Sequence, residues 1–170
     1  MVKSVRFHRV VSGLSFLAAL VLPMANRAAV PAAGVDRLKS LLNDSGLKYT
    51  WDDSGGFAKI PFSDIESMDT KAVFAYVSDK EGEWAKVRIT VLDAEKAAHF
   101  PATVVRRAMA LNRQYWLVQF AYDEKWGDID AAIGMRMEVL TGKLLKDYIK
   151  HLVSTGEQAA KDLKGVRDSN

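Results

Sequence analysis

The sequence predicts an α+β domain in which an antiparallel sheet of about five to six strands packs against three helices. Strict apolar–polar alternation, seen most clearly in residues 85–92 (AKVRITVL), is typical of strands with one face in water. Apolar residues at helical spacing recur near the N-terminus, in the middle and near the C-terminus. These stretches follow the order α-βββ(β)-α-ββ-α, without the βαβ repetition of a parallel sheet.

The first 29 residues differ from the rest of the chain. A basic segment precedes an almost wholly apolar run at 10–22, and small residues follow. This is the layout of a secretory signal peptide, and the run is shorter than the roughly 20 residues of a membrane span. We expect residues 1–29 to be a signal peptide, cleaved between Ala25 and Ala33, and 30–170 to form one domain in the periplasm or outside the cell. An uncleaved anchor or a buried helix is the alternative.

Charge and cysteine content exclude several classes. Residues 1–29 hold four of the 24 basic residues and none of the 21 acidic ones, which leaves 20 basic against 21 acidic groups after processing. A net basic balance for nucleic acid is therefore absent, and we expect no nucleic-acid partner. The chain has no cysteine, which excludes disulfides and a lipidated anchor. No later stretch is apolar enough to span a bilayer, so we expect no stable membrane insertion after signal removal.

The sequence of the first half of the domain predicts one helix and four strands. The helix has a single apolar stripe and ends at Gly46, which suits a left-handed C′ position. Two β-prone runs, 48–51 and 57–62, flank an acidic turn with a glycine pair at 52–56 and indicate a hairpin. Residues 72–78 and 85–92 form the next two strands, joined by a polar turn. The helix stripe comprises Val35, Leu38, Leu41 and Leu42.

The sequence of the second half predicts a helix, two strands and a final helix. We expect Asp93 to Ala98 to cap or begin a helical region, with Pro101 at the start of the helix and Asn112 at its end. Strands follow at 115–122 and 128–137. Thr141 is placed to cap the last helix, which we expect to reach about Leu163 before a polar tail. Its apolar stripe comprises Leu144, Leu145, Tyr148, Ile149, Leu152 and Val153.

Residues 116–130, WLVQFAYDEKWGDID, carry the densest group of acids in the chain and raise the question of a metal or proton-transfer site. The calcium-loop pattern is not met, because Asp123, Lys125 and Gly127 do not fit its first three ligand positions. Paired carboxylates for acid–base work also need a desolvated cleft, whereas a hairpin tip is wet. We interpret the stretch as a hairpin whose acids form a turn and solvated strand positions. They are Asp123, Glu124, Asp128 and Asp130.

Other chemical motifs are missing. There is no G-x-S-x-G nucleophile elbow and no glycine-rich phosphate loop. His99 and His151 have no zinc-ligand spacing. We therefore expect no catalytic residue, no metal and no cofactor. An enzyme would require buried titratable groups in a cleft.

The chain is rich in aromatic residues, with four tryptophans. Most are expected in the core, because aromatic side chains bury large areas. An exposed aromatic patch is the other interpretation, since interfaces are enriched in tryptophan and tyrosine. The candidate partner contacts are Trp126, at the expected loop tip, with Trp116 and Tyr122.

Two stretches carry a family resemblance. GVDRLKSLLNDSGLKYTWDDSGGFAKIPF has a short leucine-rich helix, a G-L-x-Y step and an acidic-glycine turn, and RRAMALNRQYWLVQFAYDEKWGDIDAAIGMRMEVLTGKLLKDYIKHLVSTGE has the matching second half. Over residues 34–158 the chain resembles type III secretion chaperone-like domains and the bacterial sensory-transduction-regulator family. The resemblance implies a homodimeric protein-binding domain without shared catalytic residues. Members are typically cytosolic, so the predicted export signal is a departure.

Two functions follow as expectations. The first is an exported, non-enzymatic protein-binding module that forms a homodimer and binds an unknown protein partner. The second is an exported domain that binds a small ligand or lipid, because a curved sheet under a long helix can leave an apolar pocket. That pocket would be lined by residues such as Phe74, Ile89, Val118, Ile133 and Tyr148.

Overall fold

A computed structural model describes residues 31–62, 67–94 and 99–169, and the predictions for the signal peptide and for residues 95–98 lie outside this part. The described chain forms three helices, α1 (Ala32–Ser45), α2 (Ala102–Leu111) and α3 (Gly142–Asp168), and a 3-10 turn at Met137–Val139. Its six strands are β1 (Thr50–Asp52), β2 (Phe57–Pro61), β3 (Ala72–Val77), β4 (Trp84–Leu92), β5 (Gln119–Tyr122) and β6 (Ile129–Arg136). The predicted α+β class is confirmed.

The strands form one antiparallel sheet in the order β1-β2-β3-β4-β6-β5. The longest ladder joins β4 to β6, from Trp84 opposite Arg136 to Leu92 opposite Ile129, with a register shift between Thr90 and Leu92. β5 pairs with β6 as the hairpin expected around the acidic turn. β1 and β5, at the two edges of the sheet, are its shortest strands.

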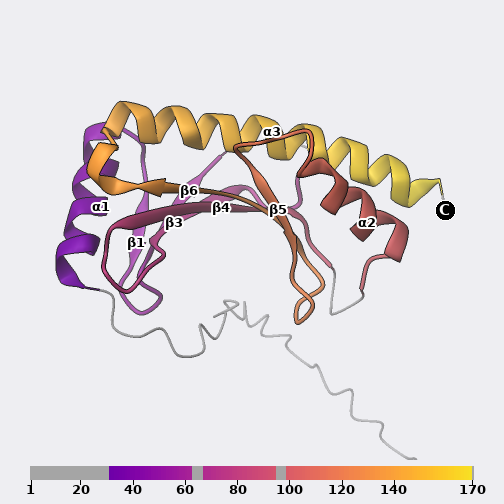
Figure 1. Ribbon diagram of the computed structural model, residues 1–170, viewed down its shortest axis with the longest axis horizontal. Coiled ribbons are helices and arrows are strands. Elements are labelled where there is room, and N and C mark those ends of the chain that lie inside the picture. Colours follow the sequence, from indigo (N-terminus) through magenta and orange to yellow (C-terminus); the bar gives the residue numbers. More distant parts are fainter. Residues whose placement is uncertain (1–30, 63–66, 95–98, 170) are drawn as a thin grey trace, which may run out of the picture.

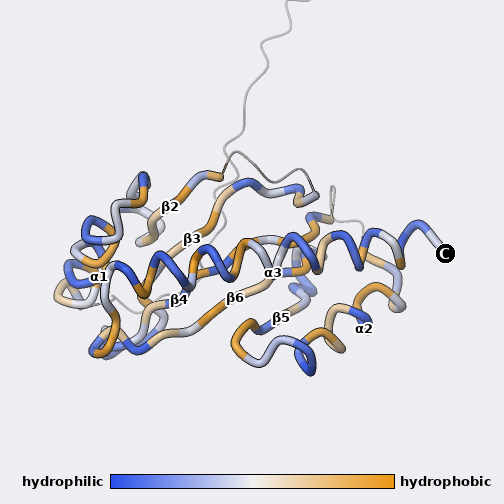
Figure 2. The backbone as a smooth tube through the Cα atoms, turned by 90° about the horizontal axis from the view of Figure 1, so that it is seen from above, coloured by the Kyte–Doolittle hydropathy of each residue, from blue (hydrophilic) through white to orange (hydrophobic). Residues whose placement is uncertain are grey.

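The helices lie on one face of the sheet (Figure 1). α3 runs along the middle of that face, α1 stands at one end, and α2 lies at the other end beside β5. Seen from above in Figure 2, α3 crosses over the centre of the sheet, with β2 on one side and β5 on the other. None of the described helices covers the opposite face, which we call the open face. The alternation in β4 explains this arrangement, because Val87 and Ile89 are fully buried toward the helices.

α3 provides much of the core. Thr141 caps it as predicted, since its hydroxyl oxygen accepts from the Leu144 N–H at 3.2 Å. Small residues in its middle let it approach the sheet closely. A Cβ on Gly156 would lie 3.1 Å from Met68 Sδ and 3.5 Å from Ile89 Cγ2. The buried residues of α3 are Gly142, Leu145, Ile149, Leu152, Thr155, Gly156, Ala159, Ala160 and Leu163.

Several element boundaries differ from the prediction. α3 continues past Leu163 to Asp168, where the ion pair of Lys164 with Asp69 ties its last turns to a distant loop. The strand expected from Tyr115 begins only at Gln119. A turn after α2 occupies the preceding residues, because the N–H groups of Gln114 and Tyr115 both donate to the Leu111 carbonyl. The predicted helix end at Gly46 is confirmed by its φ of 67°.

The outer edge of β5 is closed by one side chain. The Asn112 amide donates from Nδ2 to the Phe120 carbonyl at 3.0 Å, and the Phe120 N–H donates to Asn112 Oδ1 at 2.7 Å. Asn112 thus satisfies both backbone groups of Phe120, which a further strand would otherwise use. This arrangement protects the edge against pairing with another chain.

Replacing Asn112 by alanine is expected to lower the free energy of unfolding by about 1–2 kcal/mol, because the variant loses two hydrogen bonds at the sheet edge. It should also promote self-association with rising concentration, as the edge becomes free to pair. Urea denaturation and light scattering measure the two effects. Asn43→Ala is the matched control, since Asn43 Oδ1 accepts only an exposed hydrogen bond from Tyr49. Equal behaviour of the two variants would show that Asn112 does not protect the edge.

Candidate functional site

The open face presents a mixed aromatic and basic surface. Register places Phe74 beside Arg88, Lys86 beside Gly134, and Gln119 beside Ala132 on this face. Most of its side chains over β1 to β3 and the first half of β4 are exposed or half-buried, whereas Ala72, Thr90, Asp130 and Ala132 are largely buried. The open face comprises Thr50, Asp52, Phe57, Lys59, Pro61, Ala72, Phe74, Tyr76, Trp84, Lys86, Arg88, Thr90, Gln119, Ala121, Asp130, Ala132, Gly134 and Arg136.

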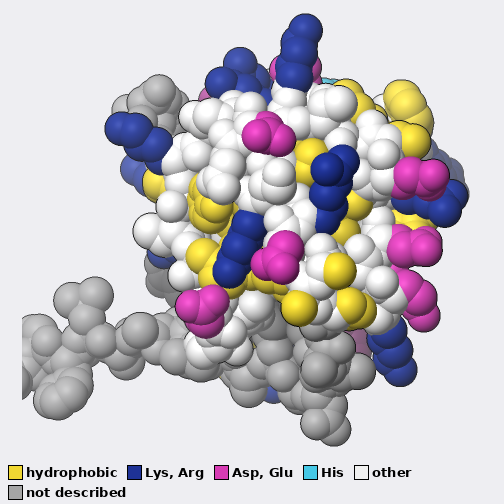
Figure 3. Space-filling view, turned by 90° about the vertical axis from the view of Figure 1, so that its left-hand side faces the viewer, with side chains coloured by type: hydrophobic (Ala, Val, Ile, Leu, Met, Phe, Trp, Pro, Cys, Tyr) yellow, Lys and Arg dark blue, Asp and Glu magenta, His cyan; other side chains and the backbone are white. Residues whose placement is uncertain are grey.

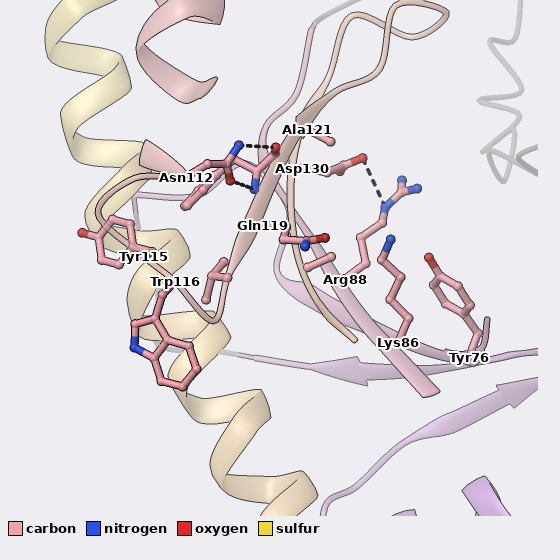
Figure 4. A pocket seen from close by; sticks show the side chains of 12 residues that line it. Tyr76, Lys86, Arg88, Asn112, Tyr115, Trp116, Gln119, Ala121 and Asp130 are labelled. Atoms are coloured by element: carbon pink, nitrogen blue, oxygen red, sulfur yellow. Dashed lines mark hydrogen bonds and ion pairs between the residues drawn. The ribbon is translucent and has the colours of Figure 1, made fainter. Parts of the chain in front are cut away.

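A hollow of about 420 Å³ lies where this face meets β5 (Figure 4). On one side Tyr76, Lys86 and Arg88 project next to one another from β3 and β4. On the other side the segment leading into β5 contributes Tyr115 and Trp116. Since these groups come from three separate parts of the chain, no local motif in the sequence could have assembled them. The alternation of β4 did indicate that Lys86 and Arg88 share a wet face.

Asp130 is held by an ion pair inside this face. Its carboxylate lies 3.3 Å from Arg88 Nε and accepts from the Thr90 hydroxyl at 2.9 Å. Only 7% of Asp130 is exposed, so the prediction of a solvated strand residue is wrong. The reason is its position between Thr90 on β4 and Ala121 on β5, which flank it on both sides. Burial raises the pKa of Asp130, while the charge of Arg88 and the bond from Thr90 oppose that rise.

Asp128 also differs from the predicted solvated carboxylate. It is half-buried, and its Oδ1 accepts from the Ala94 N–H at 3.0 Å. Burial, reinforced by the nearby charges of Asp93 and Asp130, raises the pKa of Asp128 to about 6. Asp123 does form the predicted turn, because its carboxylate accepts from the N–H groups of Lys125 and Trp126.

Replacing Asp128 by asparagine is expected to stabilise the protein at pH 7 by about 1 kcal/mol, after allowance for solvent screening. The folded protein holds the Asp128 proton more tightly than the unfolded chain, whose pKa is 3.8. Protonation therefore favours folding, and this contribution is lost as pH rises from about 4 to about 6. Asparagine keeps the acceptor for Ala94 without the charge.

Unfolding free energies across this pH range test the assignment. The difference between the wild type and Asp128→Asn should grow from near zero at pH 4 to its full value above pH 6. Asp53→Asn, at an exposed carboxylate in the β1–β2 turn, serves as the control. A difference that does not change with pH would contradict the assignment.

The three predicted partner contacts lie in different surroundings. Trp116 is 90% exposed beside the hollow. Trp126, the candidate at the expected loop tip, is half-buried, and Lys125 Nζ lies 5.0 Å from its ring centroid. Tyr122 is half-buried, and its hydroxyl lies 2.7 Å from His99 Nδ1. Trp84, at the start of β4, is 44% exposed on the open face and was missed by the sequence reasoning.

The residues named for an apolar ligand pocket do not line one cavity. Ile89, Val118 and Ile133 are at most 1% exposed within the packed core. Phe74 lies on the opposite, open face, where its ring meets Phe57 edge-on at 5.5 Å. The small residues of α3 bring the helix close to the sheet, where a Cβ on Gly156 would lie 3.5 Å from Ile89 Cγ2.

Other chemistry is not apparent in the residues that the structure describes. Within this part, no three histidine, aspartate or glutamate side chains come together in a way that could hold a metal ion. No described helix combines the length and apolar character that a membrane crossing needs. The end of the molecule shown in Figure 3 has acidic and basic side chains interspersed with apolar ones.

The fold and the open face together define a small α+β domain that keeps one side of its sheet uncovered by its described helices. A family model described as "YbjN: Putative bacterial sensory transduction regulator" matches residues 34–164, and the chain belongs to this family. The resemblance predicted from the sequence is thereby confirmed.

Two solved structures share the fold. A chain in the structure of the HopA1–SchA chaperone–effector complex superposes with a TM-score of 0.53 at 19% identity, covering 82% of this chain and 99% of that one. A chain in the crystal structure of the ExsC–ExsE complex gives a TM-score of 0.58 at 18% identity, covering 76% of this chain and 95% of that one. Among curated proteins, none matches the sequence.

Proposed function

We propose that this protein is an exported, non-enzymatic module that binds another protein through the open face of its sheet. The observation that carries the proposal is the 90% exposed Trp116 beside a hollow on a sheet face that the described helices leave uncovered. A large aromatic side chain left in water beside a concave surface is typical of an interaction site. The shared fold with chains from a chaperone–effector complex and from the ExsC–ExsE complex supports a protein as the ligand.

Export and dimer formation are parts of the same proposal. Export rests on the signal-peptide layout of residues 1–29. The homodimer rests on the family resemblance in sequence. Mass spectrometry of the protein recovered from the periplasmic fraction tests the first, and light scattering on that material tests the second. A protein that keeps Met1 and remains in the cytosol would contradict export, and a monomer at high concentration would contradict the dimer.

Capture from envelope extracts tests the binding face. The immobilised protein should retain a specific partner, the Trp116→Ala variant should retain much less, and Val139→Ala should retain as much as the wild type. Val139 is the matched control because it is also exposed (70%) but lies in the 3-10 turn after β6. If Trp116→Ala retains the same proteins in the same amounts, the open face is not the binding face.

A further inference from the structure

We propose that the hollow recognises an extended segment of the partner in which an acidic side chain lies next to an aromatic or aliphatic one. In this assignment Lys86 receives the carboxylate and Trp116 contacts the apolar group. The inference rests on the proposed function and specifies the chemistry of the partner at that same face.

The charges of the open face favour an acidic partner. Its strands carry four cations, Lys59, Lys86, Arg88 and Arg136, against two carboxylates, Asp52 at the β1 edge and Asp130. Arg88 is paired with Asp130, and Arg136 with two glutamates. A carboxylate that enters the hollow therefore meets a surface of opposite net charge.

Lys86 is the cation best placed to receive that carboxylate. Its side chain is half-buried and lines the hollow between Tyr76 and Arg88, as Figure 4 shows. No residue that the structure describes lies within ion-pair distance of its ammonium group, and its charge acts only at longer range on Asp130. An incoming carboxylate can thus pair with Lys86 while the Arg88–Asp130 pair stays intact, and partial burial strengthens the attraction relative to open water.

The floor and the far side of the hollow suit an extended apolar stretch. Ala132 and Ala121 give the floor small side chains, and Gly134 opposite Lys86 has open space around its Cα. A chain can therefore lie flat across β6. Trp116 on the far side offers an indole ring that is almost fully exposed, which an adjacent apolar side chain would cover.

Two features of the hollow exclude other modes of binding. The Phe120 backbone on the outer edge of β5 is already bonded to Asn112, so the segment is held by side-chain contacts over the sheet and not by adding a strand at that position. A second copy of this chain is also a poor occupant, because two net basic faces would repel each other.

An array of 12-residue peptides with systematically varied acidic, basic and aromatic content tests the proposal on protein purified from cells that express the full chain. We expect the strongest binding by peptides that place aspartate or glutamate beside phenylalanine or leucine. Lys86→Glu should weaken these peptides about tenfold and strengthen their lysine counterparts, and Trp116→Ala should weaken both sets by about tenfold or more. Raising the salt to about 1 M should reduce the preference for acidic peptides.

Lys150→Glu, on the exposed side of α3, and Val139→Ala are the matched controls and should change binding less than about twofold. Three outcomes would each overturn the proposal: preference for basic or uncharged peptides, absence of any binding peptide, or equal effects of Lys86→Glu and Lys150→Glu.

The partner captured from envelope extracts distinguishes a failure of this inference from a failure of the proposed function. If Trp116→Ala loses the partner and Lys86→Glu retains it fully, the binding face stands and the acidic recognition fails. If Trp116→Ala retains it, the proposed function itself fails.

Discussion

Replacing Gly142 by valine is expected to lower the free energy of unfolding by about 3 kcal/mol. Gly142 is the first residue of α3 and packs against the end of α1. A Cβ at this position would lie 2.5 Å from the backbone carbon of Asp44 and 2.6 Å from the Ser45 nitrogen. Because these are backbone atoms, no side-chain rotation relieves the clash, and the two helices must move apart.

Urea denaturation of Gly142→Val beside Gly165→Val measures this effect. Gly165 lies in the same helix with open space around it, so its replacement changes only helix propensity and should stabilise slightly. The α1–α3 contact matters for the open face as well, because the helices hold the sheet from one side only. Similar unfolding free energies for the two variants would show that the close approach of α1 and α3 is not required.

Replacing Arg88 by methionine is expected to cost about 2 kcal/mol at pH 7, because it leaves the Asp130 carboxylate buried without its charged partner. The loss should shrink as pH falls. Burial then raises the pKa of Asp130 with less opposition, so protonation neutralises the carboxyl more readily in the folded protein. The double variant Arg88→Met/Asp130→Asn should recover most of the stability, since neither charge remains.

The double-mutant cycle isolates the coupling between the two side chains. Arg136→Met is the control, because Arg136 lies on the same face but its ion pairs with Glu83 and Glu138 are exposed. It should cost less than about 1 kcal/mol. Additive effects of the two single substitutions would contradict a buried pair.

Local sequence signals predicted the parts of the fold that depend on nearby residues. Gly46 ends α1, Thr141 caps α3 and Asp123 forms the hairpin turn, and each of these features is settled within four residues of chain. The alternation of β4 likewise assigned the buried and open sides of the sheet, because side-chain direction in a strand has a period of two.

The features missed depend on contacts between distant residues. Asp130 accepts a hydrogen bond from Thr90, forty residues away, and Asp128 accepts one from Ala94, thirty-four residues away. A pattern of acids around a turn does not reveal such partners, so the sequence alone predicts both carboxylates to be solvated. The exposure of Trp116 has the same origin, since only the packing of neighbouring elements decides which tryptophan remains in water.

We expect a partner protein to dock on the open face beside Trp116. Site-specific photo-crosslinking in cells provides the test, with Trp116→p-benzoylphenylalanine beside the open face and Lys150→p-benzoylphenylalanine on the exposed side of α3. Docking at this face should give a covalent adduct to one partner protein from position 116 and none from position 150. An adduct from position 150 alone, or equal adducts from both positions, would contradict it.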